Sequence, residues 1–125
     1  MKALSIRQPW AWLIAHSYKP VENRTWNTKV RGLILIHASK SFDKKGYDWV
    51  WDNFPHIPLP LPGQFERGGI VGVAEIYAVA TASTSPWFSG PFGFCLRDVK
   101  PMPFVPMLGR LGFFEAAMPQ SVGAA

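Results

Sequence analysis

Runs of apolar residues separated by turn-forming residues predict a chain built mainly from short strands. The clearest run is Leu33–His37, which follows Gly32 and has the uniform apolar character of a buried central strand. Residues 21–26 mix β-forming residues with charges, which is typical of an edge strand. Further strands, the last of them a closing strand or turn, are predicted at residues 3–6, 70–80, 92–99 and 109–114.

Two segments repeat their apolar residues at the spacing of a helix instead. The first runs from Trp10 to Ser17 and is bounded by Pro9 and Pro20, because proline suits the start of a helix and disrupts its interior. The second is capped by Ser41. We interpret its spacing as core packing rather than as a cofactor-binding face. The apolar positions of this second helix are Tyr47, Val50, Trp51 and Phe54.

Turn-forming residues and the order of these elements indicate the fold class. Residues 55–63 hold four prolines among nine positions and therefore form a surface loop. Short strands with two early helices predict a mainly β fold with flanking α-helices, arranged as a small, partly closed β-barrel. We expect a single domain at residues 1–118, followed by a frayed tail of small residues at 119–125.

Composition and charge narrow the classes of protein to which this chain can belong. With 48% hydrophobic and 14% aromatic residues, the chain is too apolar to be disordered. Residues 1–40 carry seven Lys or Arg against one acidic residue, so the positive charge is concentrated in the first third. Such an excess favours anionic partners such as phosphate esters or nucleic acid.

The sequence does not indicate a disulfide, a metal site or a membrane segment. The single cysteine, Cys95, cannot form an intrachain disulfide, and the chain has no HxH or CxxC pattern, so we predict no metal and no cofactor. We find no apolar run of the length that a signal peptide or a membrane span needs. We therefore expect a cytoplasmic protein with no membrane partner.

The first group of candidate residues lies where the first strand ends and the first helix begins. Here Arg7 and Gln8 precede Pro9 and Trp10. Free N–H groups at a helix start favour negative charge, and a guanidinium can add a bidentate contact to a phosphate or a base edge. The alternative is that Arg7 merely holds a loop.

The second group lies around the predicted edge strand. Because side chains alternate along a strand, Glu22, Arg24 and Trp26 project from one face, close to Lys19. An aromatic plane stacks on a base, a cation holds phosphate, and a carboxylate accepts hydrogen bonds or acts as a general base. The alternative is a surface ion pair with Trp26 in the core.

Three further residues are weaker candidates. His37 ends an apolar strand and either faces the barrel mouth or is a hydrogen-bonded core histidine. Glu75 would have a raised pKa if its strand buried it, although such residues more often face solvent. Trp87, in the turn-rich stretch 85–91, forms either a wall against which a base stacks or a plug beneath the barrel.

Three segments of the chain resemble the ASCH family of PUA-like folds. They are Leu4-Ser5-Ile6-Arg7-Gln8-Pro9-Trp10, then Lys19 with Glu22-Asn23-Arg24, and Ile36-His37-Ala38, with looser similarity at 69–76, 87–93 and 106–112. The resemblance implies a β-barrel with flanking helices and a cleft that binds RNA or nucleotides. It also implies that Arg7, Lys19, Glu22 and Arg24 line that cleft.

Family members differ in activity, and the resemblance leaves several alternatives open. Some resemble amidases that remove an acyl group from acetylated cytidine, using Lys, Thr and Glu near a Gly-x-Lys motif. Here Lys19 matches the lysine, Ser17 replaces the glycine, and Glu22 stands in place of the threonine. Other members resemble ribonucleases for single-stranded RNA or are non-catalytic modules of transcriptional coactivators.

These observations predict a module that binds RNA or a nucleotide-like anionic ligand in a basic, aromatic cleft. One alternative is a hydrolase of a modified nucleoside or of single-stranded RNA, with Lys19 and Glu22 as the catalytic pair. Another is a protein-interaction domain whose aromatic residues all lie in the core. The candidate ligand-binding residues are Arg7, Gln8, Trp10, Lys19, Glu22, Arg24, Trp26, His37 and Trp87.

Overall fold

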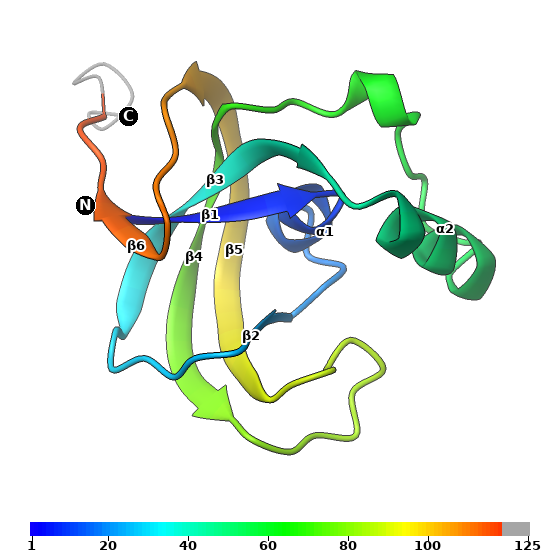
Figure 1. Ribbon diagram of the computed structural model, residues 1–125, viewed down its shortest axis with the longest axis horizontal. Coiled ribbons are helices and arrows are strands. Elements are labelled where there is room, and N and C mark those ends of the chain that lie inside the picture. Colours follow the sequence, from blue (N-terminus) through cyan, green and yellow to red (C-terminus); the bar gives the residue numbers. More distant parts are fainter. Residues whose placement is uncertain (119–125) are drawn as a thin grey trace.

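The strands of the computed structural model, which describes residues 1–118, join into one curved sheet (Figure 1). β1 and β3 are parallel, and every other neighbouring pair is antiparallel. The predicted tail at 119–125 lies outside the described residues. In their order across the six-stranded sheet, the strands are β2 (Val21–Arg24), β5 (Phe92–Pro106), β4 (Gly69–Ala80), β3 (Gly32–Phe42), β1 (Lys2–Gln8) and β6 (Phe113–Glu115).

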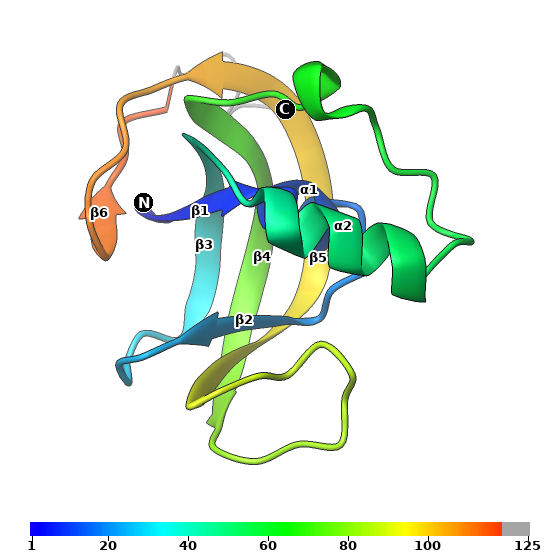
Figure 2. The ribbon, with the colours of Figure 1, turned by 45° about the vertical axis from the view of Figure 1, so that its right-hand side comes forward.

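The sheet is open, so the mainly β fold with flanking helices is confirmed and the predicted barrel is not. Within residues 1–118, β2 and β6 are the two edges and no backbone ladder joins them. The sheet curls strongly, and Figure 2 shows β1 and β2 running across the remaining strands. Across this opening the Arg24 guanidinium donates from Nη2 to the carbonyl oxygen of Ser5 at 2.8 Å. The Arg24 side chain therefore bridges β2 to the part of β1 that lies beyond its pairing with β6.

Two strands extend further than the sequence predicts. β3 begins with Leu33 exposed, is buried from Ile34 to Ala38, and continues to Phe42. β5 continues to Pro106 although it contains two internal prolines. β2 pairs with residues 92–95, and the N–H of Leu96 donates to the carbonyl oxygen of Pro20. Beyond Leu96, β5 has no second strand neighbour within residues 1–118, and such an edge is where a sheet tolerates proline.

Two helices and a short 3₁₀ turn, η1 (Pro62–Gln64), complete the fold. α1 (Trp10–Ala15) follows β1 directly, with Pro9 as its N-cap residue. α2 (Lys44–Asn53) is capped by Asp43 and not by Ser41, because Ser41 belongs to β3. Tyr47 and Val50 of α2 are buried as predicted, whereas Trp51 is 55% exposed. None of the helices in residues 1–118 is long and apolar enough to cross a lipid bilayer.

The core has a main part on one face of the sheet and a smaller part on the other. Leu4, Ile36 and Phe94 belong to the main part, which also receives α1. Leu35 and Phe114 belong to the smaller part. A third cluster joins α1, α2 and the loop before β5, and it contains Leu13, Val21, Val50 and Trp87. This third cluster fixes the loop and both helices beside the opening between β1 and β2.

Candidate functional site

A pocket of about 720 Å³ lies at the opening between β1 and β2. It is bounded by α1, by the start of α2 and by the loop that precedes β5. Two separated stretches of the early chain therefore line one hollow, as the sequence predicts. The predicted residues in its lining are Arg7, Trp10, Lys19, Glu22, Arg24, Trp26 and Trp87.

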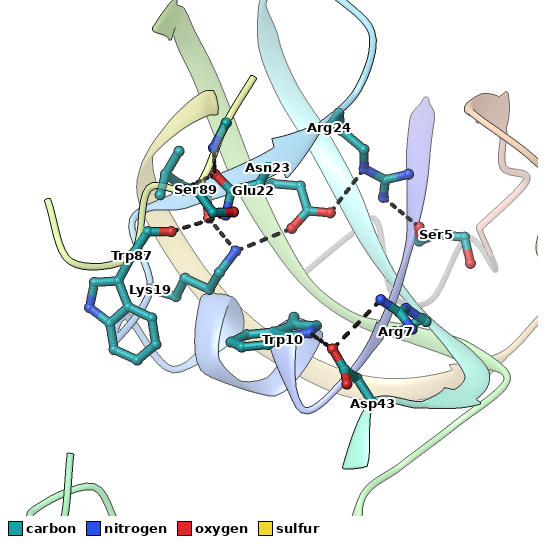
Figure 3. Close-up of polar contacts among 12 residues, drawn as sticks. Ser5, Arg7, Trp10, Lys19, Glu22, Asn23, Arg24, Asp43, Trp87 and Ser89 are labelled. Atoms are coloured by element: carbon teal, nitrogen blue, oxygen red, sulfur yellow. Dashed lines mark hydrogen bonds and ion pairs between the residues drawn. The ribbon is translucent and has the colours of Figure 1, made fainter. Parts of the chain in front are cut away.

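Glu22 holds two cations in the interior of this pocket (Figure 3). Its Oε1 lies 3.3 Å from Lys19 Nζ, and its Oε2 accepts a hydrogen bond of 2.9 Å from Arg24 Nε. Lys19 and Glu22 are 4% and 7% exposed, so this pairing takes place away from water. The low dielectric strengthens the attraction and makes either charge costly without its partner.

Lys19 uses its N–H groups within the protein. Besides Glu22, Nζ donates to the carbonyl oxygen of Val21 at 2.5 Å and lies 5.4 Å from the centre of the Trp10 ring. Burial lowers the pKa of Lys19 below its ordinary value, although Glu22 acts in the opposite direction, and Arg24 adds a smaller lowering effect. The site therefore favours the neutral amine more than water does.

Asp43 forms a second charged contact at the rim of the pocket. Its Oδ1 accepts from the backbone N–H of Gly46 at 2.9 Å, and its Oδ2 accepts from Trp10 Nε1 at 3.0 Å. Arg7 Nη2 lies 3.6 Å from Oδ2, and the Arg7 side chain is 59% exposed. Burial raises the pKa of Asp43, but these hydrogen bonds and the cations Arg7 and Lys45 outweigh it, so the pKa lies below its ordinary value.

Tryptophans form much of the pocket wall. Trp26 is half-buried, and its ring packs edge-on against Phe94 and Phe113, with Arg24 Cζ 5.8 Å from its centre. Trp87 is 9% exposed and stacks on Phe54 at 4.2 Å between ring centres. Trp87 therefore lines the pocket and is at the same time a buried member of the third core cluster.

Asn23 fixes the loop that carries Trp87. Its side-chain amide donates to the carbonyl oxygen of Trp87 at 3.0 Å. Its carbonyl oxygen accepts from the backbone N–H groups of Ser89 at 3.0 Å and Gly90 at 3.2 Å. The edge strand β2 therefore supplies pocket side chains and also holds the loop that carries Trp87.

Two predicted ligand-binding residues lie outside the pocket. Gln8 is 1% exposed and bonds to the carbonyl oxygen of Glu66 and the N–H of Trp12. His37 is also 1% exposed, with Nε2 2.7 Å from the carbonyl oxygen of Met107 and Nδ1 3.0 Å from Ser5 Oγ. Because a carbonyl only accepts, His37 Nε2 carries a proton and donates to Met107; in the neutral ring, Nδ1 then accepts from the Ser5 hydroxyl. Both residues have the surroundings of hydrogen-bonded core residues.

Glu75 is neither buried nor part of the pocket. Its Oε2 accepts from Arg97 Nη2 at 2.9 Å on the solvent face of β4 and β5. This hydrogen bond holds the pKa of Glu75 below its ordinary value. The hypothesis of a catalytic Glu75 with a raised pKa is therefore wrong, and the solvent-face interpretation holds.

Three pocket residues with evident roles were not predicted from the sequence. Asp43 takes the N-cap position of α2 that the sequence analysis assigns to Ser41, and its residue type also suits that position. Trp49 does not belong to the apolar positions that repeat along α2. This position indicates an aromatic ring that does not face the core. Gly46 lies against the Trp10 ring, where an added Cβ atom would collide. The described residues 1–118 contain no group of three His, Cys, Asp or Glu side chains placed to hold a metal.

Comparisons with known proteins place the chain in a family. Crystal structures of a serine-to-alanine and a tyrosine-to-phenylalanine variant of ZmASCH from Zymomonas mobilis are similar to it, each at 18% identity. The TM-scores are 0.51 and 0.50; the matches cover 85% and 84% of this chain and 73% and 74% of theirs. No curated protein matches the sequence. The family model for the ASCH domain matches residues 4–89, which include both predicted groups of pocket residues. The chain therefore belongs to the ASCH domain family.

Proposed function

We propose that this domain binds RNA or a nucleotide-like anionic ligand in the pocket between β1 and β2. The observation that supports this most directly is the lining itself, in which arginines with free N–H groups and tryptophan rings face one hollow of about 720 Å³. A phosphate needs the first kind of group and a base needs the second. ASCH membership supports the same ligand class.

The charges of the pocket favour a ligand with few phosphates. Its lining holds three cations and two carboxylates, which leaves a small positive excess. The Lys19 ammonium group already donates to Val21 and Glu22. Arg7 is exposed, and Arg24 Nη1 donates no hydrogen bond within residues 1–118. Arg7 and Arg24 are therefore the phosphate-binding groups, and Lys19 holds Glu22 in place.

The aromatic wall provides the base-binding part. Trp26 and Trp87 flank the cations, and stacking on an aromatic ring contributes roughly 1–3 kcal/mol per base. A protein-interaction domain would instead have both rings enclosed in the core and its cations pointing apart. Trp87 is buried, but Trp26 is only half-buried at the pocket, and Lys19 and Arg24 share one carboxylate instead of pointing apart, which favours a ligand site.

The salt dependence of binding tests this proposal. Each phosphate contact contributes about −0.7 to the slope of log K against log salt for single strands, so two arginines predict about −1.4. The measurement is fluorescence anisotropy of a labelled six-nucleotide single-stranded RNA, titrated from about 50 to 200 mM salt. Absence of binding at low salt, or a flat response, contradicts the proposal.

Arginine variants identify the groups that make these contacts. Arg7→Gln should reduce the slope by about 0.7, because it removes one phosphate contact while leaving the Glu22 pairs intact. Arg24→Gln should do the same, with some loss of stability because Arg24 also bridges β2 to β1. Arg110→Gln removes an exposed arginine outside the pocket and should leave the slope unchanged. An Arg7→Gln protein with the full slope would remove Arg7 from the proposed site.

A second candidate function is hydrolysis, and the environment of Lys19 favours it. A buried amine with a lowered pKa, 3.3 Å from a carboxylate, has the properties of a nucleophile or general base. The substrate would be an acylated cytidine or an RNA phosphodiester. Incubation with acetylcytidine and with labelled single-stranded RNA, beside the Lys19→Ala protein, tests it. Product formed by the wild-type protein alone supports catalysis, and equal background in both argues against it.

A further inference from the structure

We infer that Trp49 of α2 is a second base-stacking position at the mouth of the pocket, so that the site takes two consecutive nucleotides of a single strand. This inference rests on the proposed nucleotide-binding function and specifies the size of its ligand. The occupant is the base that follows the one held inside the pocket.

The exposure and the position of Trp49 point to this role. Trp49 lines the same pocket as the cations, yet it is 41% exposed. Its ring makes edge contacts with Phe54 and Trp87, at 5.4 and 5.8 Å between ring centres, and neither of these contacts is stacked. A large aromatic surface in water beside a pocket is a common feature of ligand sites.

The aromatic surface is continuous from the interior of the pocket to Trp49. Trp87 lines the pocket and stacks on Phe54 with an angle of 14° between the two rings, and both rings touch Trp49. α2 itself is fixed at its start, because Asp43 bonds to Gly46 and to the Trp10 ring. The Trp49 ring is therefore held in a defined position relative to the first base, which lowers the entropy lost on binding.

Cations lie near the start of α2, where the strand would leave the pocket. Arg7 is 59% exposed beside Asp43, and Lys45 also acts on the charge of Asp43 and is exposed. These two cations match a phosphodiester that links the first base to the second. Asp48, beside Trp49, is paired with Lys44, and Asp52 is the other acidic residue of α2, so Arg7 and Lys45 are the cations available to a phosphate here. This favours a nucleic acid over an apolar protein segment as the occupant of this surface.

Trp51 provides a matched control on the same helix. Two residues along an α-helix differ by about 200° in direction, so Trp49 and Trp51 point to opposite sides. Trp51 is 55% exposed, lies 6.1 Å from Tyr47 between ring centres, and is not among the pocket residues. Comparing Trp51→Ala with Trp49→Ala therefore distinguishes the loss of any exposed tryptophan from the loss of the proposed stacking position.

The experiment compares adenosine monophosphate with the RNA dinucleotide pApA by calorimetric titration. For the wild-type protein, pApA should bind more tightly than the mononucleotide. Trp49→Ala should weaken pApA binding by roughly fivefold to 150-fold and reduce mononucleotide binding much less. Trp51→Ala should change neither affinity. Trp49→Phe, which keeps an aromatic ring, should retain most of the affinity for pApA and shows that the effect is not one of misfolding.

The possible outcomes separate this inference from the proposed function. Wild-type binding of neither probe contradicts both. Mononucleotide binding with no gain from the second nucleotide contradicts only the inference about Trp49. Equal losses on both probes in Trp49→Ala would make Trp49 part of the first base site and would also overturn it, as would equal losses in the Trp49→Ala and Trp51→Ala proteins.

Discussion

Lys19 carries its amine in the interior of the protein, and this has consequences for stability as well as for chemistry. An ammonium ion removed from water costs several kcal/mol unless it is paired and hydrogen-bonded. Glu22 and the carbonyl oxygen of Val21 provide that compensation. Burial still outweighs Glu22, so the pKa of Lys19 is lower in the folded protein than in the unfolded chain.

This difference in pKa predicts how stability depends on pH. Between the native pKa of Lys19 and the ordinary value of 10.5, the unfolded chain binds more protons than the native protein. The free energy of unfolding contributed by Lys19 therefore rises with pH through this window, by about 1.4 kcal/mol for each unit that separates the two pKa values. Urea denaturation from neutral pH to pH 10.5 measures it in the wild-type and Lys19→Met proteins.

Comparison with the variant isolates Lys19 from the other groups that titrate at high pH. The stability difference between wild type and Lys19→Met should shift in favour of the wild type as pH rises. Lys29→Met, at an exposed lysine outside the pocket, should run parallel to the wild type. A wild-type minus Lys19→Met difference that does not change with pH would show that Glu22 fully compensates the burial.

The sequence predicted some pocket residues correctly and others wrongly, and strand periodicity was the main guide. Glu22, Arg24 and Trp26 were placed on one face by a period of two, and all three line the pocket, but β2 ends at Arg24, and Asn23 and Thr25 line the pocket as well. Gln8 was grouped with Arg7 because they are adjacent, but its amide turns to Trp12 and Glu66. His37 ends a uniformly apolar strand, in which no alternation shows which face a side chain joins.

At the scale of elements, β2 and the loop before β5 act as one unit through Asn23. Three hydrogen bonds from one side chain hold the backbone of Trp87, Ser89 and Gly90. An asparagine suits this position because its amide group both donates and accepts. The position of the Trp87 wall thus depends on a residue that needs no contact with ligand.

Replacement of Asn23 should loosen this wall without changing the charge of the pocket. We expect Asn23→Ala to lower the free energy of unfolding by about 1–3 kcal/mol, since three hydrogen bonds are lost. RNA affinity should fall while the salt slope stays the same, because no phosphate contact is removed. Denaturation and the anisotropy titration measure the two effects. Asn27→Ala, outside the pocket, should affect neither, and an unchanged affinity in Asn23→Ala would show that the loop keeps its position without Asn23.

Element types were predictable from the sequence, whereas several boundaries depended on tertiary contacts. The strands predicted at 21–26 and 33–37 and both helices are present, although β2 ends at Arg24 and α1 ends at Ala15. The end of β5 was missed because proline normally ends a central strand. Its edge beyond Leu96 lacks a strand neighbour within residues 1–118 because β2 is short. β3 stays paired with β1 as far as Phe42, whose partner is Gln8. The start of α2 after Phe42 therefore depends on this pairing and not on the local sequence.

At the scale of the whole molecule, the pocket exists because the sheet curls without closing. β1 and β2 are separated by three strands in the sheet, and the Arg24 side chain brings them into contact. Closure depends on strand stagger and curvature, which alternation of residue types does not encode. The sequence could therefore predict a curved mainly β fold and a cleft, but not whether backbone hydrogen bonds would complete a barrel.

An open sheet makes a prediction about local stability that a closed barrel does not. β3 and β4 are each hydrogen-bonded on both sides, whereas β2 and β6 have one neighbour each within residues 1–118. Edge strands of four and three residues can open without unfolding of the core, so the amides of β2 and β6 should exchange well before those of β4. The amides of β4 should exchange only on global unfolding, which costs about 5–15 kcal/mol. Native-state hydrogen exchange measured by NMR gives both values in one experiment. Arg24→Gln should speed exchange in β2 and leave β6 unchanged, because only β2 loses its bridge to β1. Amides of β2 as slow as those of β4 would mean that β2 has a second backbone partner in solution and that the barrel is closed after all.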